Sequence, residues 1–134
     1  IGGRRMKVLV VDDDRVLADV VAFTLRREGY QVILAYDGAS AMERWEVDEP
    51  DLIILDELFS GLSLAEVASI VPIIEKLKHQ GKTIIMIEHR LKELFRIADR
   101  VMVLNYGRKI AEGEAVEVME SPAVTEAYRG SEAD

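Results

Sequence analysis

The chain has 134 residues, 49% of them hydrophobic and 31% charged, which suits one compact globular domain and argues against disorder. Its net charge of -8 argues against nucleic acid or an anionic membrane as a partner, because like charges repel. There is no cysteine, so disulfides and Cys-ligated zinc are excluded, and no apolar run approaches the roughly 18 residues of a membrane span. We expect the chain to be a monomer without a binding partner, and to be located in the cytoplasm when it is produced as a recombinant protein.

Short apolar runs alternate with helical patterns along the chain. Six strands are predicted, at residues 7–11, 30–36, 51–55, 83–87, 101–105 and 108–113. A hairpin turn at Tyr106-Gly107 joins the last two strands, which makes the sixth strand antiparallel to the fifth. Residues 1–5 fall outside any pattern, and we expect them to be a cloning remnant.

Helices are predicted between the strands. Asp14 caps the first helix, which Gly29 ends, and four of its apolar residues recur on one side: Leu17, Val20, Val21 and Leu25. Asp37-Gly38 opens the second helix. The third follows a capping box formed by Ser63 and Glu66. A short helix is predicted at 90–98, and a final helical region at 115–129, interrupted at Ser121-Pro122.

Regular alternation of strands and helices predicts a mainly parallel sheet with helices on both faces. We expect a single α/β domain over residues 1–134, a flavodoxin-like three-layer sandwich. The predicted parallel order is 2-1-3-4-5, with the sixth strand as an extra antiparallel edge strand. One alternative stays open: the first strand could lie between the fourth and the fifth, because every candidate neighbour is equally apolar.

The first part of the chain carries a family resemblance. The run VLVVDDD places Asp12 and Asp13 directly after the first strand, YDGASAM follows the second, and PDLIILD ends the third at Asp56. These motifs resemble those of response-regulator receiver domains over about residues 6–56. The resemblance implies that Asp56 is a phosphoacceptor and that Asp12, Asp13 and Asp56 hold Mg²⁺, a hard cation that prefers oxygen ligands.

From about residue 52 to 130 the chain resembles the C-terminal half of an ABC-transporter ATPase subunit of the branched-chain amino-acid importer type. Its motifs are LIILDELFSGLS (Walker B strand and D-loop), GKTIIMIEHRLKEL (switch histidine) and ADRVMVLNYGRKIAEGEAVEVMESPAVTEAY (tail). The resemblance implies that Asp56 orders Mg²⁺, Glu57 positions water and His89 reaches the γ-phosphate. Leu58 and Ser63 depart from that family, which has proline and aspartate there.

Neither chemistry is expected to be intact. The receiver family has Thr or Ser after strand four and Lys after strand five, but Glu88 and Leu104-Asn105 stand at those places. Glu88 has the wrong charge to stabilise a phosphoryl group. ATP binding needs a G-x-x-x-x-G-K-[ST] loop that opens a helix, whereas Gly81-Lys82-Thr83 precedes a strand and therefore reads as a turn. The LSGGQ-type signature is also absent.

We therefore expect an engineered chimera that tests the compatibility of two folds, with the receiver-like segment at 6–56 and the ATPase-like segment at 57–130. We expect the chain to have no enzymatic activity and to require no cofactor. Glu57, His89 and the phosphoacceptor Asp56 are expected to be vestigial. Weak Mg²⁺ binding is expected at Asp12, Asp13 and Asp56. Two alternatives stay open, a residual receiver-type signalling module and a nucleotide-binding remnant.

Overall fold

The computed structural model describes the backbone of residues 5–133 and the side chains of residues 5–127. Residues 1–4, most of the expected cloning remnant, lie outside the described residues. The chain divides into two compact units, Ile1–His89 and Arg90–Asp134. The expectation that residues 1–134 form a single domain stays a prediction. No helix in the described part of the chain is both long and apolar enough to cross a membrane.

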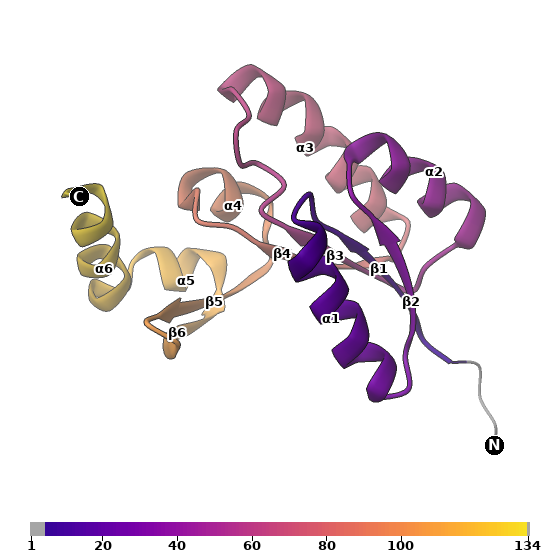
Figure 1. Ribbon diagram of the computed structural model, residues 1–134. Helices are drawn as coiled ribbons and strands as arrows, with labels where there is room; N and C mark the ends of the chain where they lie inside the picture. The colour runs from indigo at the N-terminus through magenta and orange to yellow at the C-terminus, as the bar shows by residue number, and fades with distance from the viewer. Residues whose placement is uncertain (1–4, 134) are drawn as a thin grey trace. The chain divides into compact units, whose positions relative to one another are not determined.

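The first unit is built on a four-stranded parallel sheet (Figure 1). Its strands are β1 (Lys7–Val11), β2 (Gln31–Ala35), β3 (Leu52–Asp56) and β4 (Thr83–Ile87), in the order β2-β1-β3-β4. The strand positions and the order 2-1-3-4 confirm the prediction. Because β1 lies between β2 and β3, the alternative position between the fourth and fifth strands is excluded.

Helices cover both faces of this sheet, as predicted. Helix α1 (Arg15–Arg27) packs on the face that carries Val8 and Val10. Helices α2 (Gly38–Asp48) and α3 (Leu64–His79) lie on the other face, which carries Leu9 and Val11 (Figure 1). The alternation of side chains along β1 therefore supplies the core to both layers.

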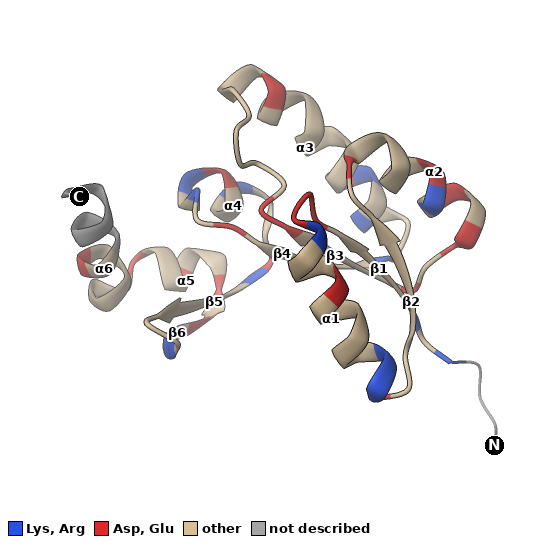
Figure 2. Cartoon of the chain, viewed as in Figure 1, with Lys and Arg blue, Asp and Glu red and all other residues tan. Residues whose placement is uncertain are grey.

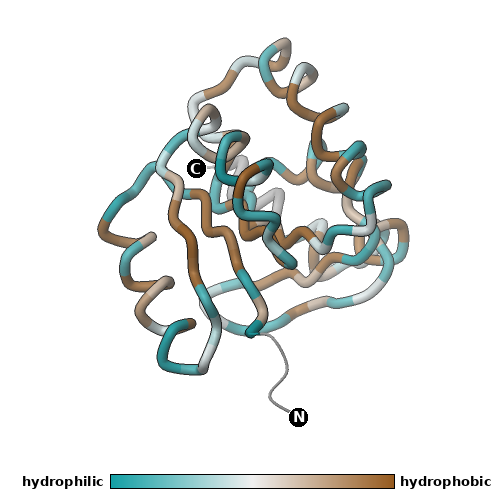
Figure 3. The backbone as a smooth tube through the Cα atoms, turned by 90° about the vertical axis from the view of Figure 1, so that its right-hand side faces the viewer, coloured by the Kyte–Doolittle hydropathy of each residue, from teal (hydrophilic) through white to brown (hydrophobic). Residues whose placement is uncertain are grey.

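The buried face of α1 agrees with the predicted one only in part: Val21 and Leu25 pack against the core as expected. Ala18 and Ala22 are buried, whereas Leu17 and Val20 are 53% and 56% exposed. Ala22 shares a core cluster with Val8, Val10 and Val32, where its small side chain permits close packing against β1 and β2. Figure 3 shows hydrophobic residues in brown along the strands and hydrophobic and hydrophilic residues interspersed along the helices.

The second unit contains α4 (Leu91–Ile97), β5 (Arg100–Asn105), β6 (Arg108–Glu114), α5 (Ala115–Met119) and α6 (Pro122–Ala133). Strands β5 and β6 form an antiparallel hairpin across Tyr106 and Gly107, which both have positive φ as a type I′ turn requires. The core of this unit joins the hairpin to its helices through buried side chains of Val101, Ala115, Val118 and Val124.

One part of the predicted sheet order is wrong. Among the described residues β5 pairs with β6 in a two-stranded sheet of its own, so it is not the fifth strand of the parallel sheet. Consequently β6 is an antiparallel strand, as expected, but not an edge strand of the main sheet. The backbone N–H and C=O groups along one edge of β5 form their hydrogen bonds with β6, so this edge does not need β4 as a partner.

Candidate functional site

Acidic residues follow three neighbouring strands of the main sheet. Val11 pairs with Leu55, so the next residues, Asp12 and Asp56, lie side by side. Asp56 itself pairs with Ile87, which places Glu88 next along β4. We refer to Asp12, Asp56, Glu57 and Glu88 as the acidic cluster. Figure 2 shows acidic segments in red where β1 and β3 end.

Asp12 is the buried member of the acidic cluster, with 5% of its surface exposed. Its Oδ1 accepts a hydrogen bond from the backbone N–H of Asp14 over 2.9 Å, which fixes the turn into α1. Its Oδ2 is buried without a hydrogen-bond partner. A buried carboxylate oxygen without a hydrogen-bond partner is costly to the folded state.

Burial and neighbouring negative charge raise the pKa of Asp56 to about 6. Burial is the largest cause, followed by the carboxylate of Asp12 and then by Glu57 and Glu88, and all of them act in the same direction. Two adjacent carboxylates can share a hydrogen bond only when one of them carries a proton. The raised pKa makes Asp56 the group that gains this proton as the pH falls toward 6.

Glu88 is fixed by the turn that follows β3. Its Oε2 accepts a hydrogen bond from the backbone N–H of Phe59 over 2.8 Å, and the side chain of Phe59 is fully buried. Glu57 supports the same junction, because its N–H donates to the carbonyl of Ile87 over 2.8 Å. The carboxylate at the end of β4 therefore has a structural role, which the sequence motifs did not reveal.

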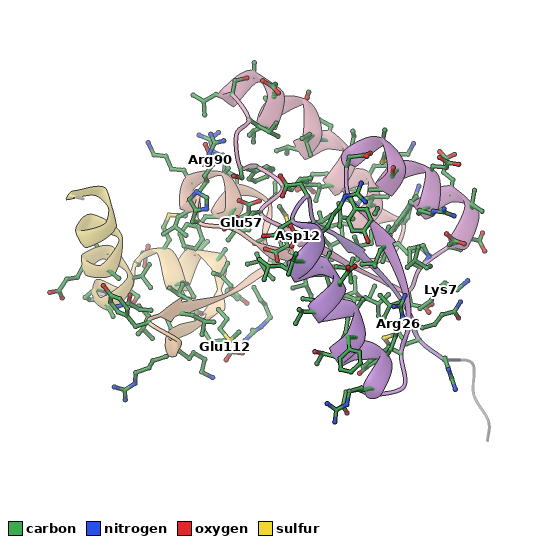
Figure 4. All side chains as sticks on the ribbon, in the orientation of Figure 1. Lys7, Asp12, Arg26, Glu57, Arg90 and Glu112 are labelled. Atoms are coloured by element: carbon green, nitrogen blue, oxygen red, sulfur yellow. The ribbon has the colours of Figure 1, made fainter. Side chains whose placement is uncertain are left out.

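The residues with ATPase resemblance meet at the surface. His89 Nδ1 lies 3.8 Å from Glu57 Oε1, and their side chains are 67% and 56% exposed. Glu57 has φ of 53°, in the left-handed region that non-glycine residues seldom adopt. The two side chains thus form a solvated surface pair. Figure 4 labels Glu57.

No phosphate-binding loop accompanies this pair. Gly81, with φ of +81°, lies between α3 and β4, so Gly81-Lys82-Thr83 is a turn into a strand, as the sequence predicted. Lys82 Nζ donates to the carbonyl of Pro50 over 3.2 Å and lies 5.5 Å from the ring centre of Trp45. Lys82 therefore packs against Pro50 and Trp45 at the end of the sheet where β3 and β4 begin.

The expected Mg²⁺ site is only partly assembled. Asp12 and Asp56 are adjacent and Asp12 Oδ2 lacks a partner, but Asp13 is exposed. In the region that the structure describes, no three His, Cys, Asp or Glu side chains are grouped to hold a metal ion. Mg²⁺ binding at Asp12, Asp13 and Asp56 therefore stays a prediction.

Two kinds of known protein are similar to this chain. The response regulator receiver domain family matches residues 8–98, more than half of the chain and well beyond the segment 6–56 that its motifs indicated. An uncharacterized ABC transporter ATP-binding protein, MJ1023 of Methanocaldococcus jannaschii, is 39% identical over 80 residues. That match covers 60% of this chain and 30% of the relative, so the chain spans about a third of the relative's length.

Solved structures give the same two groups. The ADP conformation of MJ1267, an ATP-binding cassette of an ABC transporter, has a TM-score of 0.60 at 32% identity, over 68% of this chain and 37% of that one. A signal receiver domain from Bermanella marisrubri has a TM-score of 0.55 at 25% identity, over 71% and 78%. Chemotaxis response regulator CheY4 of Vibrio cholerae has 0.51 at 26%, over 62% and 68%.

These similarities agree with the parallel sheet of the first unit. The receiver match includes all of the main sheet except Lys7, because it begins at residue 8 and β4 ends at Ile87. The similarity to ATP-binding cassettes is a second, independent likeness of the same chain. The chain belongs to the response regulator receiver domain family.

Proposed function

We propose that the chain is an engineered chimera, a receiver-type fold completed by a segment of the ABC-ATPase type, with no intact phosphotransfer or ATPase activity. The observation that carries the proposal is the composition of the acidic cluster. Asp56, the residue at the phosphoacceptor position, has Asp12, Glu57 and Glu88 as its charged neighbours, and each of them raises its pKa. A phosphoryl group adds negative charge, which this surrounding field opposes.

The ATPase half of the proposal rests on the exposed pair Glu57 and His89. A catalytic carboxylate and histidine act on a nucleotide only where backbone N–H groups and a lysine hold its phosphates. The sequence contains no such loop, and Gly81-Lys82-Thr83 leads into β4. The tail after residue 98 is of the branched-chain amino-acid importer type, and its role in this chain is structural.

The engineered origin is supported by the junction itself. Both resemblances include β3, where an apolar strand ends in Asp56, so a change of family there preserves the strand. Just beyond it, Ser63 departs from the ATPase pattern and caps α3 in a complete capping box with Glu66. The purpose that fits these features is a test of whether fragments of two α/β folds are compatible.

The experiment combines two ligands. Calorimetric titration with Mg-ATP is expected to give no saturable heat, and saturable micromolar binding would revive the nucleotide-binding alternative. Incubation with acetyl phosphate and Mg²⁺ is expected to leave Asp56 unmodified. Modification of Asp56 would instead support a residual signalling module, which the adjacency of Asp12 and Asp56 makes the second candidate.

A further inference from the structure

A cavity of about 300 Å³ lies in the first unit between α2, α3 and the sheet. Leu9 and Ile53 of the sheet form its floor, and Trp45 of α2 and Ile74 of α3 contribute to its walls. Every side chain that lines it is nonpolar, and the backbone of Gly38 completes the lining. The cavity is separate from the acidic cluster, whose four residues are absent from its lining.

Small residues on α2 leave this space open. Ala39 and Ala41 line the cavity from α2, opposite the larger Ile70 and Ile73 of α3. None of the residues of α2 is fully buried, and Met42 remains 41% exposed. The different origin of the two helices rests on the proposed function: in the proposed chimera, α2 belongs to the receiver-like segment and α3 to the ATPase-like segment, so the two facing helix surfaces come from different sources. Their side chains consequently meet without filling the space between them.

We propose that this cavity binds a small uncharged aromatic molecule of two or three rings. Nonpolar cavities of about half this volume remain dry and bind single aromatic rings, and about 300 Å³ is the lower end of the range for ligand pockets. A charged or strongly polar molecule would lose its hydration without gaining a hydrogen bond from the lining. With no polar group to fix an orientation, selectivity should follow size and hydrophobicity.

Trp45 supplies a direct readout, because it lines the cavity and is the only tryptophan in the chain. The probe is N-phenyl-1-naphthylamine, which is uncharged and fluoresces strongly only in a nonpolar environment. Titration into the full chain should give saturable probe fluorescence with one site per chain. Emission from Trp45 should fall in parallel, with the same half-saturation concentration, because the bound probe lies beside the indole.

Two variants of α2 locate the site. Ala41→Phe adds a ring inside the cavity, and Val47→Phe adds the same ring at a position that is 69% exposed and outside the lining. We expect Ala41→Phe to weaken probe binding at least tenfold and Val47→Phe to leave it unchanged. Ala39→Leu, which fills the same cavity, replaces Ala41→Phe if that variant fails to fold. Non-saturable binding, or equal affinity in the filled and control variants, would overturn the proposal.

Discussion

Glu88 accepts a hydrogen bond from the backbone N–H of Phe59 over 2.8 Å, so the residue that follows β4 holds the turn that follows β3. The position that the receiver resemblance reserves for Thr or Ser is therefore occupied by a carboxylate with a structural task. The same carboxylate adds negative charge beside Asp56. The fold gains a fixed turn at the site where phosphotransfer chemistry requires a neutral hydroxyl group.

Glu88→Ala should destabilise the chain by about 1–3 kcal/mol, because the N–H of Phe59 loses its charged acceptor in a partly buried position. Glu88→Gln keeps an oxygen acceptor and removes a charge from the acidic cluster. It should therefore retain most of the stability at neutral pH. Urea unfolding of the two variants at pH 7 measures the difference, and an equal loss in both would show that the hydrogen bond contributes little.

Asp56→Asn should stabilise the chain in a pH-dependent manner. The folded pKa of Asp56 is about 6, above the value of about 3.9 for an unfolded aspartate, so protonation favours the folded state. The stabilising contribution of this proton is complete below about pH 4 and is lost as pH rises through 6. The variant should accordingly be more stable than the parent at pH 8, and the gain should shrink toward zero near pH 4.

Urea unfolding at several pH values between 4.5 and 8 tests this expectation. Asp37→Asn is the matched control, because the backbone N–H of Ser40 lowers the pKa of Asp37 as the cap of α2. A lowered pKa reverses the sign, so the stability contributed by Asp37 is present at neutral pH and is lost on acidification. A gain for Asp56→Asn that is equal at all pH values would contradict the raised pKa.

Ser63→Ala should cost about 1 kcal/mol, since it removes the side chain that accepts the N–H of Glu66 at the start of α3. Ser63→Asp restores the residue of the ATPase pattern and also caps a helix, so its loss should be smaller. Ser69→Ala, within the same helix, controls for the change of hydroxyl to methyl. Thermal unfolding measures all three; a loss for Ser69→Ala as large as that for Ser63→Ala would refute the role of the cap.

Mg²⁺ should bind weakly beside Asp12 and Asp56, and less at pH 5 than at pH 7.5. Below pH 6 the proton on Asp56 competes with the cation, and Asp12 Oδ2 is the buried oxygen without a partner. Amide shifts in an NMR titration should map to Asp12, Asp13 and Asp56 and disappear in Asp12→Asn. Asp19→Ala, on α1 outside the acidic cluster, should leave them unchanged; shifts that persist in Asp12→Asn would place the ion elsewhere.

Much of the fold was predictable from local patterns. Apolar runs located the strands to within about one residue at each end, and Asp14, Asp37 and Ser63 were recognisable as helix caps. The pairing of β5 was not predictable, because 83–87 and 101–105 are equally apolar and pairing depends on contacts far apart in sequence. The buried face of α1 was predicted only in part: Val21 and Leu25 pack on the core, but the small Ala18 and Ala22 are buried in place of Leu17 and Val20.

The position of the acidic cluster was predictable from the sequence, but the contacts of its side chains were not. Parallel strand ends placed Asp12 and Asp56 together, and the wrong charge of Glu88 was readable from its position after β4. The hydrogen bond between Glu88 and Phe59 and the cavity beside Trp45 were not predictable from the sequence. Both depend on how α3 and the turn before it pack in three dimensions. Such packing is set by side-chain volumes from distant segments.

The central claim is that Asp56 does not accept a phosphoryl group. Intact-mass spectrometry of the chain after incubation with acetyl phosphate and Mg²⁺ tests it most directly, with Asp56→Asn and a native receiver domain treated in parallel. We predict that the native domain gains the mass of one phosphoryl group while this chain and its Asp56→Asn variant remain unmodified. A stable gain of that mass in this chain, absent from Asp56→Asn, would contradict the account.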